Sequence, residues 1–146
     1  MANLIDLCRN LPTKTFAAGE TVMEENVKDG EILILKKGAV EIRRHGTEIA
    51  TISNPGSTLG EIAVLLETGH SASAVALQDC EFFVMDHADE MLNSNPRLYR
   101  EIACTLARRL VNVSEKTTEL LDQIELDREQ HEQEFSAISM WGADGA

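Results

Sequence analysis

Glycines divide the first 85 residues of this chain into short segments, and this spacing constrains the fold more than any other feature. Seven of the nine glycines fall between residues 19 and 69. The segments between them are rich in β-branched and aliphatic residues, as strands usually are. They cover residues 31–35, 40–43, 47–52, 72–77 and 81–85. Short strands at spacings of about 8–12 residues predict an antiparallel β-sandwich or jelly-roll-like β-roll, and no helix longer than two turns is indicated before residue 87.

Helical patterns flank this β-rich region. An amphipathic segment at residues 3–10 stops before a proline, and Asp86 is placed to cap a short helix over residues 87–93. Asn95 and Pro96 then supply an N-cap and a proline at the first helical position of a long helix. The sequence therefore predicts four parts: an N-terminal helix (1–11), a β-roll (12–94), a C-terminal helix (95–138) and a loose tail (139–146).

An apolar seam runs along the C-terminal helix. Apolar or small residues recur at intervals of 4, 3, 4, 3 and 4, a heptad pattern that predicts pairing with a second helix. The same register reaches Asp127, His131 and Glu134 after the last apolar position, so the seam ends there. We therefore expect a homodimer that pairs over about residues 102–124, through Leu106, Leu110, Val113, Thr117, Leu120 and Ile124.

The charge of the chain argues against two classes of partner. With 25 acidic and 13 basic residues, the net charge is −12. A field of this sign repels nucleic acid and anionic lipid, whose non-specific binding depends on neutralising phosphates. The basic pairs Lys36-Lys37, Arg43-Arg44 and Arg108-Arg109 are expected to be solvated. We expect neither a nucleic-acid nor a membrane partner.

The cysteines and the apolar runs indicate a cytoplasmic protein. Cys8, Cys80 and Cys104 show no CxxC spacing and are odd in number, as expected of reduced, mostly buried thiols. No apolar run approaches the roughly 18 residues of a membrane span. The N-terminal segment lacks the charged and apolar regions of a signal peptide.

One segment carries a binding motif. Gly60-Glu61 opens a short apolar turn over residues 62–66, and His70-Ser71-Ala72 begins ten residues after Gly60. This arrangement resembles the phosphate-binding cassette of the cyclic nucleotide-binding domain family, whose pattern runs Phe-Gly-Glu-x-Ala-Leu-Leu, a short gap, then Pro-Arg-Ser-Ala. The spacing agrees, but His70 stands where the family has its phosphate-binding arginine.

The resemblance extends over roughly residues 12–125. Residues 16–20 look like the first strand and turn of the family, residues 33–42 like its strand–glycine–strand signature, and residues 76–81 like the approach after the cassette. Residues 95–116 resemble the dimer helix of catabolite-activator-type regulators. Those regulators continue into a helix-turn-helix domain, for which the twenty or so residues after Leu126 are too few, and no basic recognition helix is present. A DNA-binding regulator that lacks its second domain is a rival interpretation, which the acidic charge opposes.

The resemblance implies a site for cyclic AMP or cyclic GMP and a role for each cassette residue. Backbone N–H groups after Gly60 would face the phosphate, Glu61 would accept a hydrogen bond from the ribose hydroxyl, and Ser71 would donate to a phosphate oxygen. The full predicted phosphate site comprises Gly60, Glu61, Ile62, Ala63, His70, Ser71 and Ala72. On the purine side, the Thr-Ser pair of the regulator helix corresponds to Val113-Ser114, so one hydroxyl is lost and one is kept.

Two interpretations of His70 stay open. A neutral imidazole offers one N–H in place of a charged guanidinium fork, and losing a charge-assisted hydrogen bond would weaken binding about ten- to a hundred-fold. A nearby phosphate would favour protonation of the ring and so tighter binding at lower pH. In the alternative, His70 is an ordinary exposed loop residue and the pocket holds no cyclic nucleotide.

Catalytic and metal-binding motifs are absent from the sequence. His45, His70, His87 and His131 form no HxH or HExxH motif, and no GxSxG nucleophile elbow occurs. We therefore expect no enzyme and no metal, but a stand-alone regulatory domain. It would bind a cyclic nucleotide weakly or with altered specificity and signal through its C-terminal helix to a protein partner. A degenerate dimeric interaction module that binds no nucleotide is the alternative.

Overall fold

The computed structural model describes residues 3–144, with side-chain surroundings for residues 3–136. The chain divides into two compact units, Met1–Thr105 and Leu106–Ala146. The first unit holds all the strands, the three short helices and the beginning of the long helix α4 (Pro96–Asp144). The second unit is the remainder of α4, and each unit is described by itself below.

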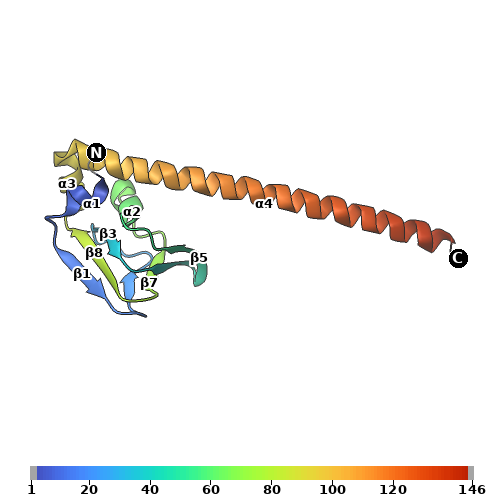
Figure 1. The fold of residues 1–146 in the computed structure, drawn as a ribbon, viewed down its shortest axis with the longest axis horizontal. Coiled ribbons are helices and arrows are strands. Elements are labelled where there is room, and N and C mark those ends of the chain that lie inside the picture. The colour runs from blue at the N-terminus through green and yellow to red at the C-terminus, as the bar shows by residue number, and fades with distance from the viewer. Residues whose placement is uncertain (1–2, 145–146) are drawn as a thin grey trace. The chain divides into compact units, whose positions relative to one another are not determined.

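Eight antiparallel strands form two four-stranded sheets (Figure 1). In the first sheet the order is β1 (Thr13–Phe16), β8 (Cys80–Met85), β3 (Ile32–Lys37) and β6 (Thr58–Leu59). In the second it is β2 (Thr21–Met23), β7 (Ser73–Ala76), β4 (Val40–Arg44) and β5 (Thr47–Ile52). The predicted β-sandwich is therefore confirmed. The glycine spacing did not indicate β1, β2 or β6. Of these, β2 and β6 are too short to show an alternation of apolar and polar residues.

The main core lies between the two sheets. Phe16 of β1 and Phe82 of β8 meet edge to face there, with ring centroids 5.8 Å apart. Strand β3 is buried on both faces, because Leu33 and Leu35 point into this core while Ile32 and Ile34 point to the other side, where α1 contacts β3. The buried core residues are Phe16, Leu33, Leu35, Val40, Ile42, Leu59, Ala72, Ala74, Ala76, Cys80 and Phe82.

Short helices lie at one end of the strands (Figure 1). Helix α1 (Leu4–Cys8) matches the predicted N-terminal helix and begins with a capping box between Asn3 and Asp6. Helix α3 (Ala88–Ser94) also matches the prediction, but its cap does not. The N-cap residue is His87 in a left-handed conformation, and the Asp86 carboxylate accepts from the His87 N–H, which precedes the helix. The predicted Asp86 cap is wrong by one residue.

Helix α4 begins as the sequence predicts. The Asn95 side chain accepts a hydrogen bond from the Leu98 N–H at 3.2 Å, and Pro96 is the first helical residue. The first turns belong to the first unit, since Leu98 and Ile102 are almost completely buried there. The helix continues through Asp144, past the predicted end at residue 138, because no proline interrupts it; residues 145–146 lie outside the described part of the chain. No described helix is long and apolar enough to cross a membrane.

The three cysteines are expected to differ sharply in reactivity. Burial raises the pKa of the Cys8 thiol from 9.0 to about 11, so at pH 8 only about one molecule in a thousand carries the reactive thiolate there. Cys80 is buried as well, and its thiol donates to the Gln78 carbonyl, whereas Cys104 is half-exposed. An aromatic disulfide reagent should modify one thiol, Cys104, in the native protein and three after unfolding. Two fast thiols in the native protein would contradict this.

The Cys8 pKa also sets the sign of a pH effect on stability. The folded state holds the thiol proton more tightly than the unfolded chain does. This contribution is therefore complete below about pH 9 and is lost as the pH rises towards 11. In urea titrations, replacing Cys8 by alanine should reduce the fall in stability over that window.

Candidate ligand-binding site

Helix α2 (Glu61–Leu66) is the short apolar turn that the motif predicted. It starts at Gly60, whose φ of 89° is a left-handed conformation that favours glycine. A β-carbon built at this position would lie 2.6 Å from the Glu31 carbonyl oxygen and 3.2 Å from Cε1 of His70. The backbone at Gly60 is therefore packed directly against the His70 ring. Glu61, the next residue, is only 2% exposed.

His70 is buried, with 3% of its surface exposed, and this overturns the interpretation of it as an ordinary exposed loop residue. Its Nε2 lies 3.1 Å from Oδ1 of Asp29, within ion-pair distance but outside hydrogen-bond geometry. Its Nδ1 has no hydrogen-bond partner among the described residues. A buried polar atom without a partner is costly, so the ring edge beside Gly60 is suited to a polar group of a ligand.

The loop between β2 and β3 holds the histidine in place. The Asn26 N–H donates to the His70 carbonyl at 2.8 Å, and the His70 N–H donates to the Val27 carbonyl at 2.9 Å. Gly69 lies so close to the Asn26 backbone that a β-carbon there would overlap it. Asp29 is fixed in turn, because its Oδ1 accepts from the Glu31 N–H at 3.0 Å. The sequence motif did not indicate this loop, because its residues are distant from the cassette in sequence and reach it only in the folded chain.

The end of strand β4 contacts the cassette, as the loop between β2 and β3 does. Nε of Arg44 donates to the Ser71 carbonyl at 3.1 Å. Next to it, the side chain of His45 lies 3.2 Å from Oε2 of Glu25, and the Glu25 N–H donates to the Ser73 hydroxyl. Ser71 itself is exposed, while Ala72 belongs to the core between the sheets. Arg44 is exposed, as the sequence predicted, and it also contacts the cassette through this hydrogen bond.

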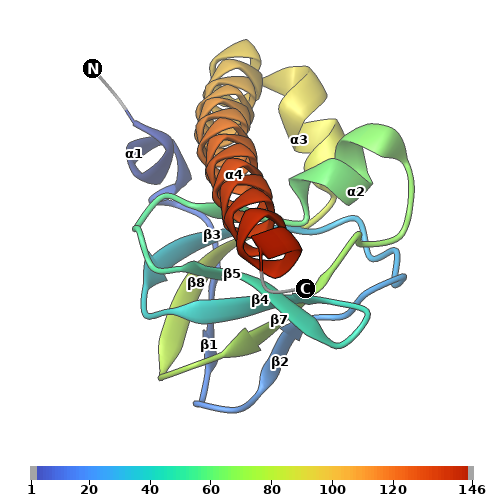
Figure 2. The same ribbon diagram turned by 90° about the vertical axis from the view of Figure 1, so that its right-hand side faces the viewer.

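The structure buries most of the predicted phosphate site and packs Gly60 against His70. Gly60, Glu61, Ala63, His70 and Ala72 are buried, and α2, which follows Gly60, lies beside α3 (Figure 2). Two members are open to solvent: Ile62, which is 39% exposed, and Ser71. The predicted purine-side pair, Val113-Ser114, belongs to the second unit, so its contact with a purine stays a prediction.

The nearest acidic side chains make the site unfavourable for an anion on their own. Asp29 and Glu61 both lie in it, and His70 faces Asp29. A positively charged His70 would at most balance the Asp29 carboxylate. The His70–Asp29 pair by itself therefore supplies no net positive charge for an anionic ligand. Of the residues that the structure describes, no three His, Cys, Asp or Glu side chains are grouped to hold a metal ion.

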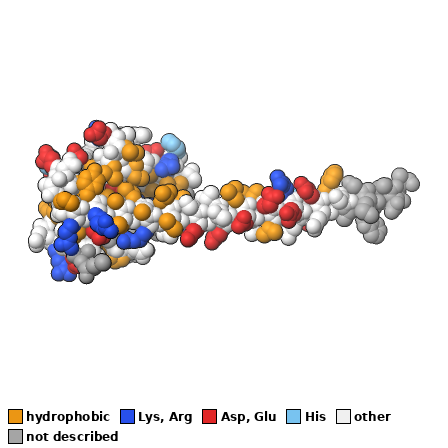
Figure 3. All heavy atoms as spheres, turned by 90° about the horizontal axis from the view of Figure 1, so that it is seen from above, with side chains coloured by type: hydrophobic (Ala, Val, Ile, Leu, Met, Phe, Trp, Pro, Cys, Tyr) orange, Lys and Arg blue, Asp and Glu red, His pale blue; other side chains and the backbone are white. Residues whose placement is uncertain are grey.

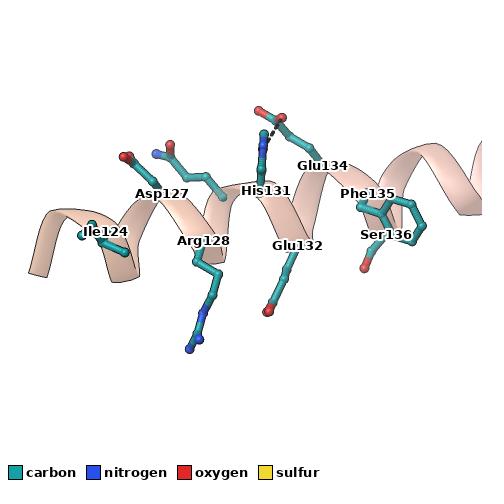
Figure 4. Close-up of a pocket in the computed structure, with 9 residues that line it drawn as sticks. Ile124, Asp127, Arg128, His131, Glu132, Glu134, Phe135 and Ser136 are labelled. Carbon is teal, nitrogen blue, oxygen red and sulfur yellow. Dashed lines mark ion pairs between the residues drawn. The ribbon is translucent and has the colours of Figure 1, made fainter. Parts of the chain in front are cut away.

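A hollow on α4 lacks the form of a ligand-binding site. It is lined by residues between Ile124 and Ser136, all from one helix (Figure 4). The labelled side chains project from that helix in different directions, and only His131 and Glu134 are drawn as an ion pair. A ligand pocket is concave and encloses most of its ligand, which side chains of a single helix do not do.

Comparisons with known proteins agree with this geometry. A family model described as the cyclic nucleotide-binding domain matches residues 13–93. The chain is 30% identical over 78 residues to a cAMP-dependent protein kinase regulatory subunit of Yarrowia lipolytica, covering 53% of this chain and 20% of that protein. It is 30% identical over 96 residues to the Pycsar effector protein XpPycTIR of Xanthomonas perforans, covering 64% and 31%. It thus spans only a fifth to a third of these relatives.

Solved structures share the fold. The catabolite activator protein of Thermus thermophilus superimposes with a TM-score of 0.64 at 25% identity, over 80% of this chain and 58% of that one. A cyclic nucleotide-binding domain from Methylobacillus flagellatus gives a TM-score of 0.61 at 20% identity, over 75% and 65%. Together with the site geometry, these similarities support the predicted resemblance.

Proposed function

The chain belongs to the cyclic nucleotide-binding domain family, and we propose that it is a regulatory sensor that binds a cyclic nucleotide weakly or with altered specificity. It has no catalytic activity of its own in this proposal, acts in the cytoplasm and passes ligand occupancy through α4 to a protein partner. A switch of this kind requires that the ligand bind two positions of the helix with different affinities.

The observation that carries the proposal is the buried edge of His70 beside Gly60. Its unpartnered Nδ1, the buried Glu61 and the left-handed Gly60 lie within one short segment. Burying an unsatisfied nitrogen costs about 1–3 kcal/mol, which a ligand oxygen that accepts or donates there would recover. A cyclic nucleotide carries both a phosphate and a ribose hydroxyl, which fit a donor at His70 and an acceptor at Glu61.

Calorimetric titration with cyclic AMP and cyclic GMP at pH 6 and pH 8 tests ligand binding. We expect saturable binding that is tighter at pH 6, because a protonated imidazole adds a positive charge near the phosphate. Equal affinity at both pH values would remove His70 as a protonatable ligand. No heat with millimolar ligand at either pH would overturn the proposed function.

The second unit supports a dimer as the form in which the sensor works. Leu110, Val113, Leu120 and Ile124 of the predicted seam are each more than half exposed, and Figure 3 shows apolar side chains separated by acidic ones along this helix. Phe135 is 72% exposed and follows Ile124 by eleven residues, or three helical turns. It therefore shares the apolar face, which extends that face past the predicted end of the seam. Such a face is more stable when covered by a second copy.

Replacing Leu110 and Leu120 by lysine should produce monomers. Charged groups placed in a helix seam repel each other and lose the apolar contact that holds the pair together. Sedimentation velocity at several concentrations measures the outcome. Lysine at Glu115 and Glu119, outside the seam, is the matched control and should leave the dimer intact. An unchanged sedimentation profile for the seam variant would refute the predicted dimer seam.

One observation favours the alternative of a degenerate interaction module. The Asp29 carboxylate already faces His70, so the cation that would meet a phosphate is partly neutralised from within the protein. In that case the roll and the helix seam would be retained as a scaffold, and the titrations above would give no heat. The seam variant would still dissociate, which separates the two functions experimentally.

A further inference from the structure

We propose that Arg44 supplies the guanidinium that pairs with the ligand phosphate, in place of the arginine that His70 has replaced. This inference rests on the proposed function, since it names the positive charge that the cassette lacks. It is carried by the position of Arg44 at the end of β4, by its contact with Ser71, and by the absence of an acidic partner for it among the described residues.

The register of β4 places Arg44 at the cassette. Val40 pairs with Ala76 and Ile42 with Ala74 across β4 and β7, and all four side chains are buried. Alternate residues of a strand share a face, so Arg44 lies on the same side of β4 as Val40 and Ile42, although its side chain is exposed. Arg44 is the last residue of β4 and still pairs with Thr47 of β5, and its side chain reaches the Ser71 carbonyl.

The Arg44 guanidinium is held in place by a hydrogen bond, but its charge is not balanced by an acidic side chain among the described residues. Only Nε is used, in the bond to the Ser71 carbonyl, and within residues 3–136 no ion pair engages the terminal nitrogens. Its neighbour Arg43 differs, because Nε of Arg43 lies 2.8 Å from Oε1 of Glu41 in an ion pair. A guanidinium with two free terminal nitrogens matches two phosphate oxygens. Arg44 therefore has the chemistry that the imidazole lacks.

The charges around the cassette favour the same assignment. His70 faces Asp29, so the imidazole gives no net attraction for an anion. Arg44 is hydrogen-bonded to the backbone of Ser71, the exposed residue that follows His70. Glu25 contacts the residue after Arg44, because its Oε2 lies 3.2 Å from Nδ1 of His45 and its Oε1 accepts from the His45 N–H.

The test compares Arg44→Gln with the matched control Arg43→Gln by calorimetry with cyclic AMP, cyclic GMP and adenosine. Arg44→Gln should weaken cyclic nucleotide binding about ten- to a hundred-fold, whereas Arg43→Gln should change it less than about two-fold. Adenosine lacks the phosphate, so its affinity should not change in either variant. Arg44→Lys should recover part of the loss, and Arg44→Gln should flatten the dependence of binding on ionic strength.

The outcomes separate this inference from the proposed function. If the wild type binds and Arg44→Gln and Arg43→Gln lose the same affinity, the role of Arg44 is overturned. The proposed sensor function then still stands. If the wild type does not bind, the sensor proposal fails, and Arg44→Gln is then compared in the His70→Arg protein. A loss there supports Arg44 as a phosphate ligand, and no loss overturns it. If His70→Arg does not bind either, both proposals fall.

Discussion

Replacing His70 by arginine should raise the affinity for cyclic AMP or cyclic GMP by about ten- to a hundred-fold, because it restores a charge-assisted hydrogen bond. The new guanidinium would start from the buried position beside Gly60 that the imidazole now occupies. Part of the gain would be lost to Asp29, which lies 3.1 Å from the present ring. Adding Asp29→Asn to His70→Arg should therefore increase the affinity further. Calorimetric titration measures both steps.

The control for this prediction is His70→Gln, which keeps a polar side chain but adds no charge. It should bind no more tightly than the wild type. A decrease in affinity with arginine would mean that the phosphate does not lie at this position. An increase with glutamine equal to that with arginine would mean that removing the imidazole, and not adding charge, controls the site.

Gly69→Ala should destabilise the first unit by about 3 kcal/mol and abolish ligand binding. Its β-carbon would overlap the carbonyl of Asn26 and would lie 2.9 Å from the Asn26 Cα. Backbone atoms cannot move aside as a flexible side chain does, so the loop between β2 and β3 must shift. That shift breaks the two hydrogen bonds that join Asn26 and Val27 to His70, each worth about 1 kcal/mol. Thermal unfolding should show a loss of roughly 10 °C.

Gly30→Ala is the matched control for this substitution. It lies in the same loop and also has a positive φ, of 70°, but a β-carbon there meets no atom within 4 Å. It should therefore cost only about 1 kcal/mol, from backbone strain, and leave ligand binding nearly unchanged. Equal effects of the two alanines on melting temperature would show that the close approach of Gly69 to Asn26 does not hold the cassette.

The parts of the fold that sequence predicted are those with local patterns. Strand β5 was predicted at its full length, and Asn95-Pro96 marked the start of α4, since turn glycines and caps act over a few residues. The Asp86 cap was misplaced by one residue because His87 adopts a left-handed conformation that no side-chain pattern indicates. Strands of two or three residues left no periodic signal.

In the candidate site, too, the sequence predicted the local features and missed those that depend on residues distant in the chain. The cassette spacing located Gly60, Glu61 and His70 correctly as neighbours, because the segment is continuous. Asp29 and Arg44 could not be found in this way, since they reach the cassette from a loop and a strand far away in the chain. The position of Arg44 beside Ser71 depends on the pairing of β4 with β7, which the sequence pattern does not give.

The measurement that tests the sensor most directly is a titration of the ¹⁵N-labelled protein with cyclic AMP and cyclic GMP, followed through backbone amide resonances. We predict saturable shifts at Gly60, which packs against the His70 ring, and at the chain neighbours of His70, Gly69 and Ser71. Shifts of α4 amides such as that of Leu110 should appear at the same ligand concentrations. Shifts at the cassette alone would remove the signalling role of α4. No shift at the cassette with millimolar ligand would contradict the assignment of this site to a cyclic nucleotide.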